Sequence, residues 1–214
     1  LMQVVAEVNA TGYGLTFGMH SRIDDRVADV VAAVEAGNIY VNRNQIGAVV
    51  GVPPFGGQGL SGTGPKAGGP NYLARLCQPA LNETAHVSVA EIELPGPTGE
   101  ENRLSYMPRG RLLCLGGDNP NALARQIERV EATGNQAVTL DTVTTQALIA
   151  MQGIDGIVAD GAMRKLATTA LAAREGAILP LLSAEDATER FFLEKVVPVN
   201  TTAAGGNALL LADL

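Results

Sequence analysis

The chain has 214 residues, 46% of them apolar and 17% charged, which is enough to bury one or two cores. Its formal net charge of -7, without any cluster of lysine and arginine, argues against a nucleic-acid-binding surface. The two cysteines, Cys77 and Cys114, lack CxxC spacing and a neighbouring histidine, so we expect no metal site and a reducing, cytoplasmic setting.

The first 42 residues predict helices and strands in alternation. Apolar residues spaced for one helix face predict a helix over 2–9 and a second over 23–37. Strands are expected at 15–19 and 38–42. Because the apolar pattern begins at Leu1 without a polar lead-in or cap, we expect a fragment of a longer domain.

Residues 45–70 predict a long structured loop. Their glycines and prolines leave no room for a helix or a central strand. Apolar and aromatic side chains, including Phe55, favour packing over disorder.

The polar, turn-rich stretch 91–108 predicts a boundary, after which a second unit begins. Its first helix has Asn119 as the predicted N-cap and Pro120 as the first helical residue. Alternation of strands with helices predicts a small, doubly wound parallel sheet. The predicted strands lie at 111–115, 137–140, 154–159 and 177–182, and the helices at 120–134, 142–151 and 162–174.

Residues 191–199 predict a final strand, in which Pro198 is tolerated only near an end or on an edge. The tail over 200–207 is small and flexible in composition. Leucines follow it at 209–211, and they favour a docked tail.

Several motifs carry a family resemblance. GNIYVN at 37–42 and PPFGGQGLSGTG at 53–64 resemble the aldehyde dehydrogenase superfamily in order and spacing, over about the first 75 residues. KAGGPNYLARL at 66–76 is similar to the glutamate semialdehyde (pyrroline-5-carboxylate) dehydrogenase branch. The stretches LPGPTGEENR, PRGRLLCL and VNTTAAGGN resemble the bifunctional proline utilization A flavoenzymes.

The resemblance implies an α/β fold, in which the C-terminal part of an aldehyde dehydrogenase catalytic domain precedes a small Rossmann-like domain with a parallel sheet. The expected parts are a catalytic-domain piece over 1–77, a linker over 78–108, a Rossmann-like accessory domain over 109–190, and an oligomerisation strand with a C-terminal tail over 191–214.

The resemblance also implies a reaction, the NAD-dependent oxidation of L-glutamate γ-semialdehyde to glutamate in proline catabolism. The same enzyme would contain an FAD-dependent proline dehydrogenase. In that family the catalytic cysteine and the NAD-binding domain lie upstream, so we expect no catalytic residue here, no cofactor bound to this fragment, and no activity of the fragment alone. Cys114 lies in an apolar run, where a buried hydrophobe is expected rather than a thiolate.

Three residues are candidates for substrate binding. By resemblance, Gly47 and Ala48 belong to a loop whose backbone amides hold the substrate's α-carboxylate, an arrangement that backbone N–H groups can form. Phe55 matches an aromatic wall of the aldehyde pocket. From the residues alone, the favoured interpretation is that Gly47 is a turn glycine and Phe55 a core aromatic.

The turn LGGDNP at 115–120 follows a strand and opens a helix, but it lacks GxGxxG spacing, and Asp118 would repel a pyrophosphate. We therefore favour an accessory domain without a ligand, although a small-ligand-binding domain over 109–190 stays open. A further alternative is a non-catalytic scaffold, in which 191–199 pairs as an edge strand with a neighbour.

The expected partners are a small-molecule substrate and further copies in a homo-oligomer. We expect no nucleic acid to bind this region. Membrane insertion is not expected either, because the apolar stretches are far shorter than the roughly twenty residues of a span.

Overall fold

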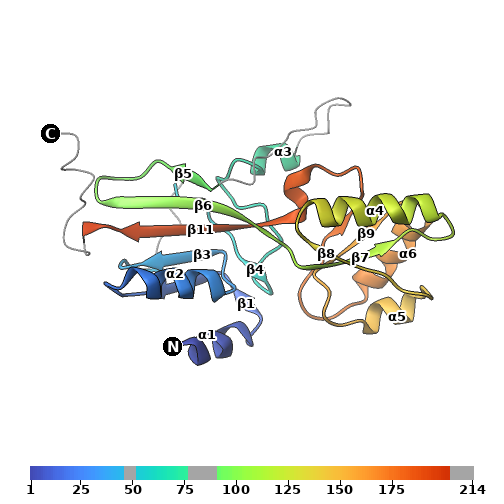
Figure 1. The fold of residues 1–214 in the computed structure, drawn as a ribbon, viewed down its shortest axis with the longest axis horizontal. Coiled ribbons are helices and arrows are strands. Elements are labelled where there is room, and N and C mark those ends of the chain that lie inside the picture. Colours follow the sequence, from blue (N-terminus) through green and yellow to red (C-terminus); the bar gives the residue numbers. More distant parts are fainter. Residues whose placement is uncertain (46–51, 77–90, 203–214) are drawn as a thin grey trace. The chain divides into compact units, whose positions relative to one another are not determined.

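The computed structural model describes residues 1–45, 52–76 and 91–202, which form two compact units (Figure 1). Among the described residues, the first unit contains 1–45, 52–76, 91–106 and 194–202, and the second contains 107–193. The first unit is thus assembled from segments that are far apart in the sequence.

A five-stranded sheet with the order β2-β3-β11-β6-β5 forms the first unit. Its strands are β2 (Thr16–Met19), β3 (Asn38–Val41), β5 (Ile92–Leu94), β6 (Glu100–Pro108) and β11 (Phe192–Asn200). Strands β2 and β11 run parallel to β3, whereas β5 is antiparallel to β6. Asn38 is paired with Thr16 on one side and Val196 on the other, so it lies between two neighbouring strands.

The two faces of this sheet differ in chemistry. Helices α1 (Met2–Asn9) and α2 (Asp24–Ala33) share an apolar cluster with the sheet, as predicted from their spacing. The buried members are Val5, Val30, Val34, Ala36, Ile39, Val41 and Val197. Because side chains alternate along a strand, Asn38 and Tyr40 point to the opposite face. The glycine-rich loop lies on that second face, since the side chain of Asn38 binds it.

The predicted loop over 45–70 contains only a short strand among its described residues. Strand β4 (Gln58–Gly59) pairs antiparallel with β1 (Tyr13–Gly14), and the five-residue helix α3 (Tyr72–Leu76) follows the loop. The absence of a longer described element agrees with the glycine and proline content.

The strand predicted over 191–199 is confirmed as β11, but it does not lie at a sheet edge as the alternative of a non-catalytic scaffold required. Strand β11 lies between β3 and β6 and is hydrogen-bonded to both. Most of its residues are buried, which a central strand requires. Pro198, which has no N–H to donate, lies near the strand's end, where the sequence allows it.

The second unit is a parallel sheet with helices on both faces, in agreement with the predicted α/β class. Its strand order is β10-β9-β7-β8, and every pair is parallel. The strands are β7 (Arg111–Leu115), β8 (Gln136–Val138), β9 (Gly156–Ala159) and β10 (Leu181–Leu182). In Figure 1, α4 (Pro120–Ala132) lies on one face, and α5 (Thr145–Ala150) and α6 (Gly161–Ala172) lie on the other.

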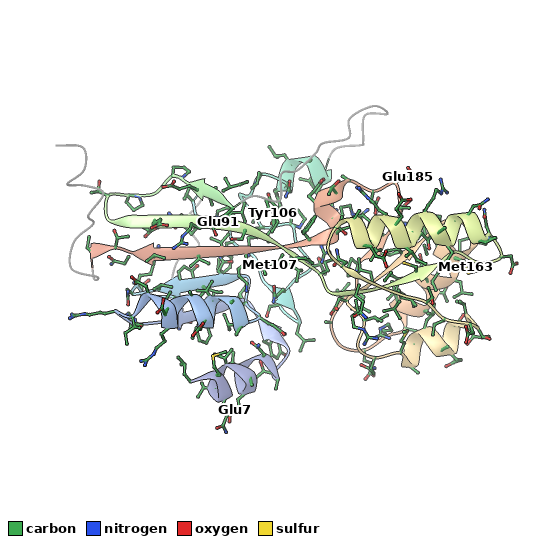
Figure 2. The ribbon with its side chains drawn as sticks, in the orientation of Figure 1. Glu7, Glu91, Tyr106, Met107, Met163 and Glu185 are labelled. Atoms are coloured by element: carbon green, nitrogen blue, oxygen red, sulfur yellow. The ribbon has the colours of Figure 1, made fainter. Side chains whose placement is uncertain are left out.

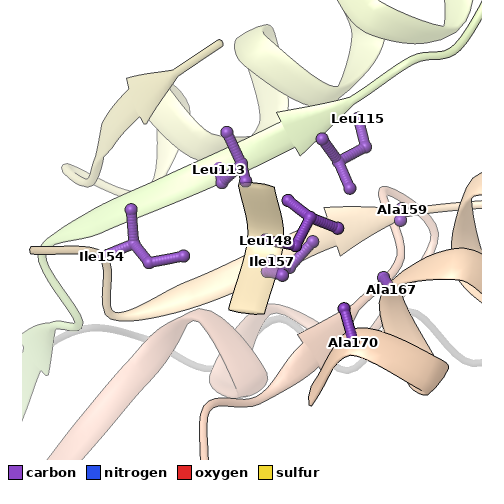
Figure 3. Close-up of a cluster of buried hydrophobic side chains, with 8 residues drawn as sticks. All are labelled: Leu113, Leu115, Leu148, Ile154, Ile157, Ala159, Ala167 and Ala170. Atoms are coloured by element: carbon purple, nitrogen blue, oxygen red, sulfur yellow. The ribbon is translucent and has the colours of Figure 1, made fainter. Parts of the chain in front are cut away.

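One apolar cluster joins β7 and β9 to α5 and α6 (Figure 3). Leu148 from α5 is fully buried between the strand residues Leu113 and Ile157 and the small residues of α6. Ala167 and Ala170 let α6 approach the sheet closely because they carry no more than a methyl group.

The strand predicted over 177–182 is shorter than expected, because only Leu181 and Leu182 pair with β9. Gly176 has a positive φ of 92°, Ile178 is 76% exposed, and Pro180 has no N–H for a ladder. The 3-10 helix η1 (Thr188–Phe191) then leads into β11.

Of the helices in the described residues, none combines the length and the apolar character needed to cross a membrane.

The N-cap predicted for α4 provides a test of the second unit. The side chain of Asn119 accepts hydrogen bonds from the N–H groups of Asn121 and Ala122, at 3.0 and 3.2 Å. We expect Asn119→Ala to lower the free energy of unfolding by about 1 kcal/mol, because both N–H groups lose their acceptor. Denaturant unfolding measures this loss, and Asn121→Ala is the control, since the exposed side chain of Asn121 does not cap the helix. Equal losses in the two variants would contradict the assignment.

Candidate functional site

The structure describes one of the three predicted site residues, Phe55. Gly47 and Ala48 lie outside the described residues. Phe55 lies in the glycine-rich loop with a partly buried side chain. Its backbone N–H donates to the carbonyl of Ala67 at 3.0 Å, and its carbonyl accepts from the N–H of Ala67 at 2.9 Å. Phe55 is therefore held by a backbone bridge within the loop.

Asn38 joins this loop to the sheet. Its side chain is fully buried, and Nδ2 donates to the carbonyl of Pro54 at 2.8 Å. Its Oδ1 accepts from the N–H of Gly56 at 3.1 Å. One side chain on β3 thus fixes the residues immediately before and after Phe55.

Lys66 completes the network from the far end of the loop. It is 2% exposed, and its ammonium Nζ donates to Asn38 Oδ1 at 3.1 Å and to the carbonyl of Gly56. Burial lowers the pKa of Lys66 to about 8, and the nearby Glu194 carboxylate opposes this shift. A buried amine of this kind needs its hydrogen bonds, so it holds the loop against β3.

The close approach of the loop requires a glycine at position 37. A Cβ at Gly37 would collide with the carbonyl oxygen of Gly56, and it would lie 2.7 Å from Lys66 Nζ. Any side chain there would displace the loop from the sheet.

Glu194, on β11, binds the same loop through its carboxylate. Oε2 accepts from the backbone N–H of Lys66 at 2.6 Å, and Oε1 accepts from Asn71 Nδ2 at 2.8 Å. Asn71 Nδ2 also donates to the hydroxyl of Tyr106 on β6 at 3.2 Å (Tyr106 is labelled in Figure 2). The end of the loop is therefore attached to two further strands.

Arg43, which follows β3, is fixed by a second network. Its guanidinium forms an ion pair with Glu100 on β6 and lies 5.3 Å from the centre of the Tyr40 ring. Glu100 Oε1 also accepts from Asn102 Nδ2 at 3.0 Å. Burial is the main reason that the pKa of Tyr40 is raised.

These networks position the backbone of the loop, and Cys114 takes no part in them. Cys114 is buried in β7, where burial, with a smaller contribution from Glu131, raises the pKa of its thiol to about 12. A thiolate at neutral pH is therefore disfavoured. Within the ranges 1–45, 52–76 and 91–202, histidine, cysteine and acidic side chains form no group of three that could hold a metal ion.

The turn at 115–120 in the second unit does not fit a dinucleotide. Leu123 fills the space next to Gly116, where a pyrophosphate would need to approach the backbone. Asn119 already accepts from two of the N–H groups at the start of α4. These donors are therefore occupied by the chain itself.

The sequence alone did not mark Asn38, Lys66 and Glu194 as members of the site. Asn38 and Lys66 lie in motifs that carried the resemblance, but their roles depend on contacts across 28 residues. A usable signal was the pair Glu194 and Lys195, because two charged residues interrupt an otherwise apolar strand.

Comparisons with known proteins confirm the family resemblance. Residues 1–80 match the model of the aldehyde dehydrogenase family. The chain is 37% identical to the bifunctional protein PutA of Salmonella typhimurium over 285 aligned positions, which cover 99% of this chain and 22% of that protein. A 1-pyrroline-5-carboxylate dehydrogenase from Bacillus thuringiensis is 47% identical over 70 residues, which are 33% of this chain and 14% of that enzyme.

The fold is similar to a solved structure of proline utilization A (PutA) from Corynebacterium freiburgense. That match has a TM-score of 0.68 and 25% sequence identity, and it covers 92% of this chain and 24% of the other. The chain therefore spans roughly a fifth to a quarter of the length of the PutA proteins that it matches.

The lowered pKa of Lys66 predicts a specific pH dependence. In the unfolded chain the amine titrates near 10.4, so between about pH 8 and pH 10 the unfolded state binds a proton that the folded state has lost. The free energy of unfolding should therefore rise with pH in this window, by up to about 1.4 kcal/mol per pH unit from this residue.

Lys66→Met should remove that contribution, and the difference in slope between the two proteins isolates it from other titrating groups. Urea unfolding at pH 7, 8, 9 and 10 gives the two slopes. Parallel curves for the two proteins would show that the amine is not buried as described.

Proposed function

We propose that this chain, which belongs to the aldehyde dehydrogenase family through residues 1–80, is part of an enzyme that oxidises L-glutamate γ-semialdehyde to glutamate in proline catabolism. The similarity to proteins named PutA and 1-pyrroline-5-carboxylate dehydrogenase supports this substrate. The observation that carries the role of this chain is the attachment of the loop around Phe55 to Asn38 and Lys66.

The role of the loop is to hold the substrate. The backbone amides of Gly47 and Ala48 bind the α-carboxylate, and Phe55 forms an apolar wall along the substrate chain. Rigid support matters for this task, because a binding group that is displaced by a fraction of an ångström loses much of its contribution. The hydrogen bonds from Asn38 on both sides of Phe55 supply such support.

The cofactors and the nucleophile belong to other parts of the full-length enzyme. NAD, when bound there, accepts a hydride from the substrate, and FAD serves a proline dehydrogenase activity of the same polypeptide. This chain contributes binding and orientation, because Cys114 is buried with a raised pKa and the LGGDNP turn does not fit a pyrophosphate.

The remaining segments have supporting roles in this proposal. Residues 1–77 are a piece of the catalytic domain, and 109–190 an accessory domain without a ligand. Strands β5 and β6, which lie in the stretch 78–108 that was expected to be a linker, belong instead to the sheet of the first unit. Residues 191–214 serve assembly of a homo-oligomer through a route other than an exposed edge of β11, since both edges of that strand are paired. The enzyme acts in the cytoplasm.

The isolated chain tests whether the nucleophile and the NAD-binding domain lie in other parts of the enzyme. We expect no measurable reduction of NAD when the purified 214-residue polypeptide is mixed with pyrroline-5-carboxylate, because it lacks the nucleophile and the cofactor domain. The full-length enzyme, assayed in parallel, should turn over. Steady turnover by the purified fragment would contradict the proposal.

A substitution at Gly47 tests the carboxylate grip. In the full-length enzyme, Gly47→Leu should raise KM for the semialdehyde about tenfold or more, because the added side chain blocks access to the backbone amides. Thr63→Leu is the control, since its side chain is exposed in the same loop and takes no part in the bridge that holds Phe55. The grip is rejected if KM for Gly47→Leu equals that of the unmodified enzyme.

A further inference from the structure

Two carboxylates that bind the site come from outside the family-matched residues 1–80. Glu100 lies at the start of β6 and Glu194 near the start of β11. Both strands follow the glycine-rich loop in sequence, and both join the sheet that supports it.

Glu194 fixes the carboxyl-terminal end of the loop. Its Oε2 accepts from the backbone N–H of Lys66 at 2.6 Å, and its Oε1 accepts from the side-chain amide of Asn71 at 2.8 Å. Both are charge-assisted hydrogen bonds to a partly buried carboxylate, a class that is stronger than a neutral pair. Lys66 in turn binds Asn38 and Gly56, so the effect of Glu194 reaches the residue next to Phe55.

Glu100 binds the side chain of Arg43, which lies two residues before the start of the loop at residue 45. Its ion pair with Arg43 is largely shielded from water, with side-chain exposures of 15% for Glu100 and 16% for Arg43. The Tyr40 ring and the amide of Asn102 hold the two partners in place. Shielding of this kind makes the pair worth more than an ion pair on the open surface.

We propose that Glu100 and Glu194 are positioning residues for substrate binding, through which β6 and β11 set the geometry of the loop around Phe55. They do not touch substrate. The expected rise in KM rests on the proposed function. The expected effect on the structure of the loop does not.

The neighbours of the two glutamates provide matched controls. Glu101 points to the opposite sheet face, where its carboxylate binds Arg103 at 2.7 Å and is 37% exposed. Lys195 also points away from the loop, and its Nζ donates to the carbonyls of Val31 at 2.8 Å and Val34 at 3.1 Å. Glu101→Gln therefore controls for charge, and Lys195→Met controls for general loss of stability.

The kinetic test uses Glu100→Gln and Glu194→Gln in the full-length enzyme, because glutamine keeps the shape and removes the charge. KM for the semialdehyde should rise about tenfold in each, as expected for loss of a charge-assisted hydrogen bond, while kcat falls by less. Glu101→Gln and Lys195→Met should keep the original KM. A fall in kcat with unchanged KM, or an equal rise in KM for the controls, would overturn the proposal.

A second measurement does not depend on catalysis. Hydrogen exchange of the 214-residue chain should show faster exchange of backbone amides between 52 and 71 in Glu194→Gln than in Glu101→Gln. If the full-length enzyme does not oxidise the semialdehyde, the proposed function fails while faster exchange still supports the positioning role. Unchanged exchange in this segment would overturn the positioning role itself.

Discussion

Burial of the Lys66 ammonium group is the constraint on which the candidate site depends. An amine taken out of water must keep its hydrogen bonds, and this one finds acceptors in Asn38 and in the carbonyl of Gly56. The loop can satisfy the amine only by folding closely against β3. That closeness in turn leaves no space for a side chain at Gly37. Gly37 and Lys66, which lie in different motifs, are therefore both required for the close packing of the loop against β3.

The register of the central sheet extends this arrangement to distant parts of the chain. Asn38 is paired with Val196 of β11, which places Glu194 near the end of the loop. Adjacent residues of β11 serve opposite faces, because Lys195 binds the last carbonyls of α2. The strand thus connects the helix-covered face to the loop-covered face. Removing it would leave the backbone N–H of Lys66 and the amide of Asn71 without an acceptor on one face, and the carbonyls of Val31 and Val34 without this donor on the other.

The sequence predicted local features better than contacts between distant segments. Hydrophobic spacing located α1 and β7, and Asn119 with Pro120 marked the start of α4, because these signals act over a few residues. The strand at 191–199 was also predicted, but its place in the sheet was not, since pairing with β3 depends on residues more than 150 positions away. Phe55 was recognised by resemblance, whereas Asn38, Lys66 and Glu194 became evident only from their contacts.

The proposed role of the loop is to bind the substrate, and the proposed role of the sheet is to hold that loop in place. A crystal structure of the full-length enzyme with the product L-glutamate tests this assignment most directly. We expect the α-carboxylate within about 2.7–3.2 Å of the backbone nitrogens of residues 47 and 48, with the methylene groups against Phe55. Glutamate bound with its α-carboxylate away from these amides, and with Phe55 out of contact, would contradict the account.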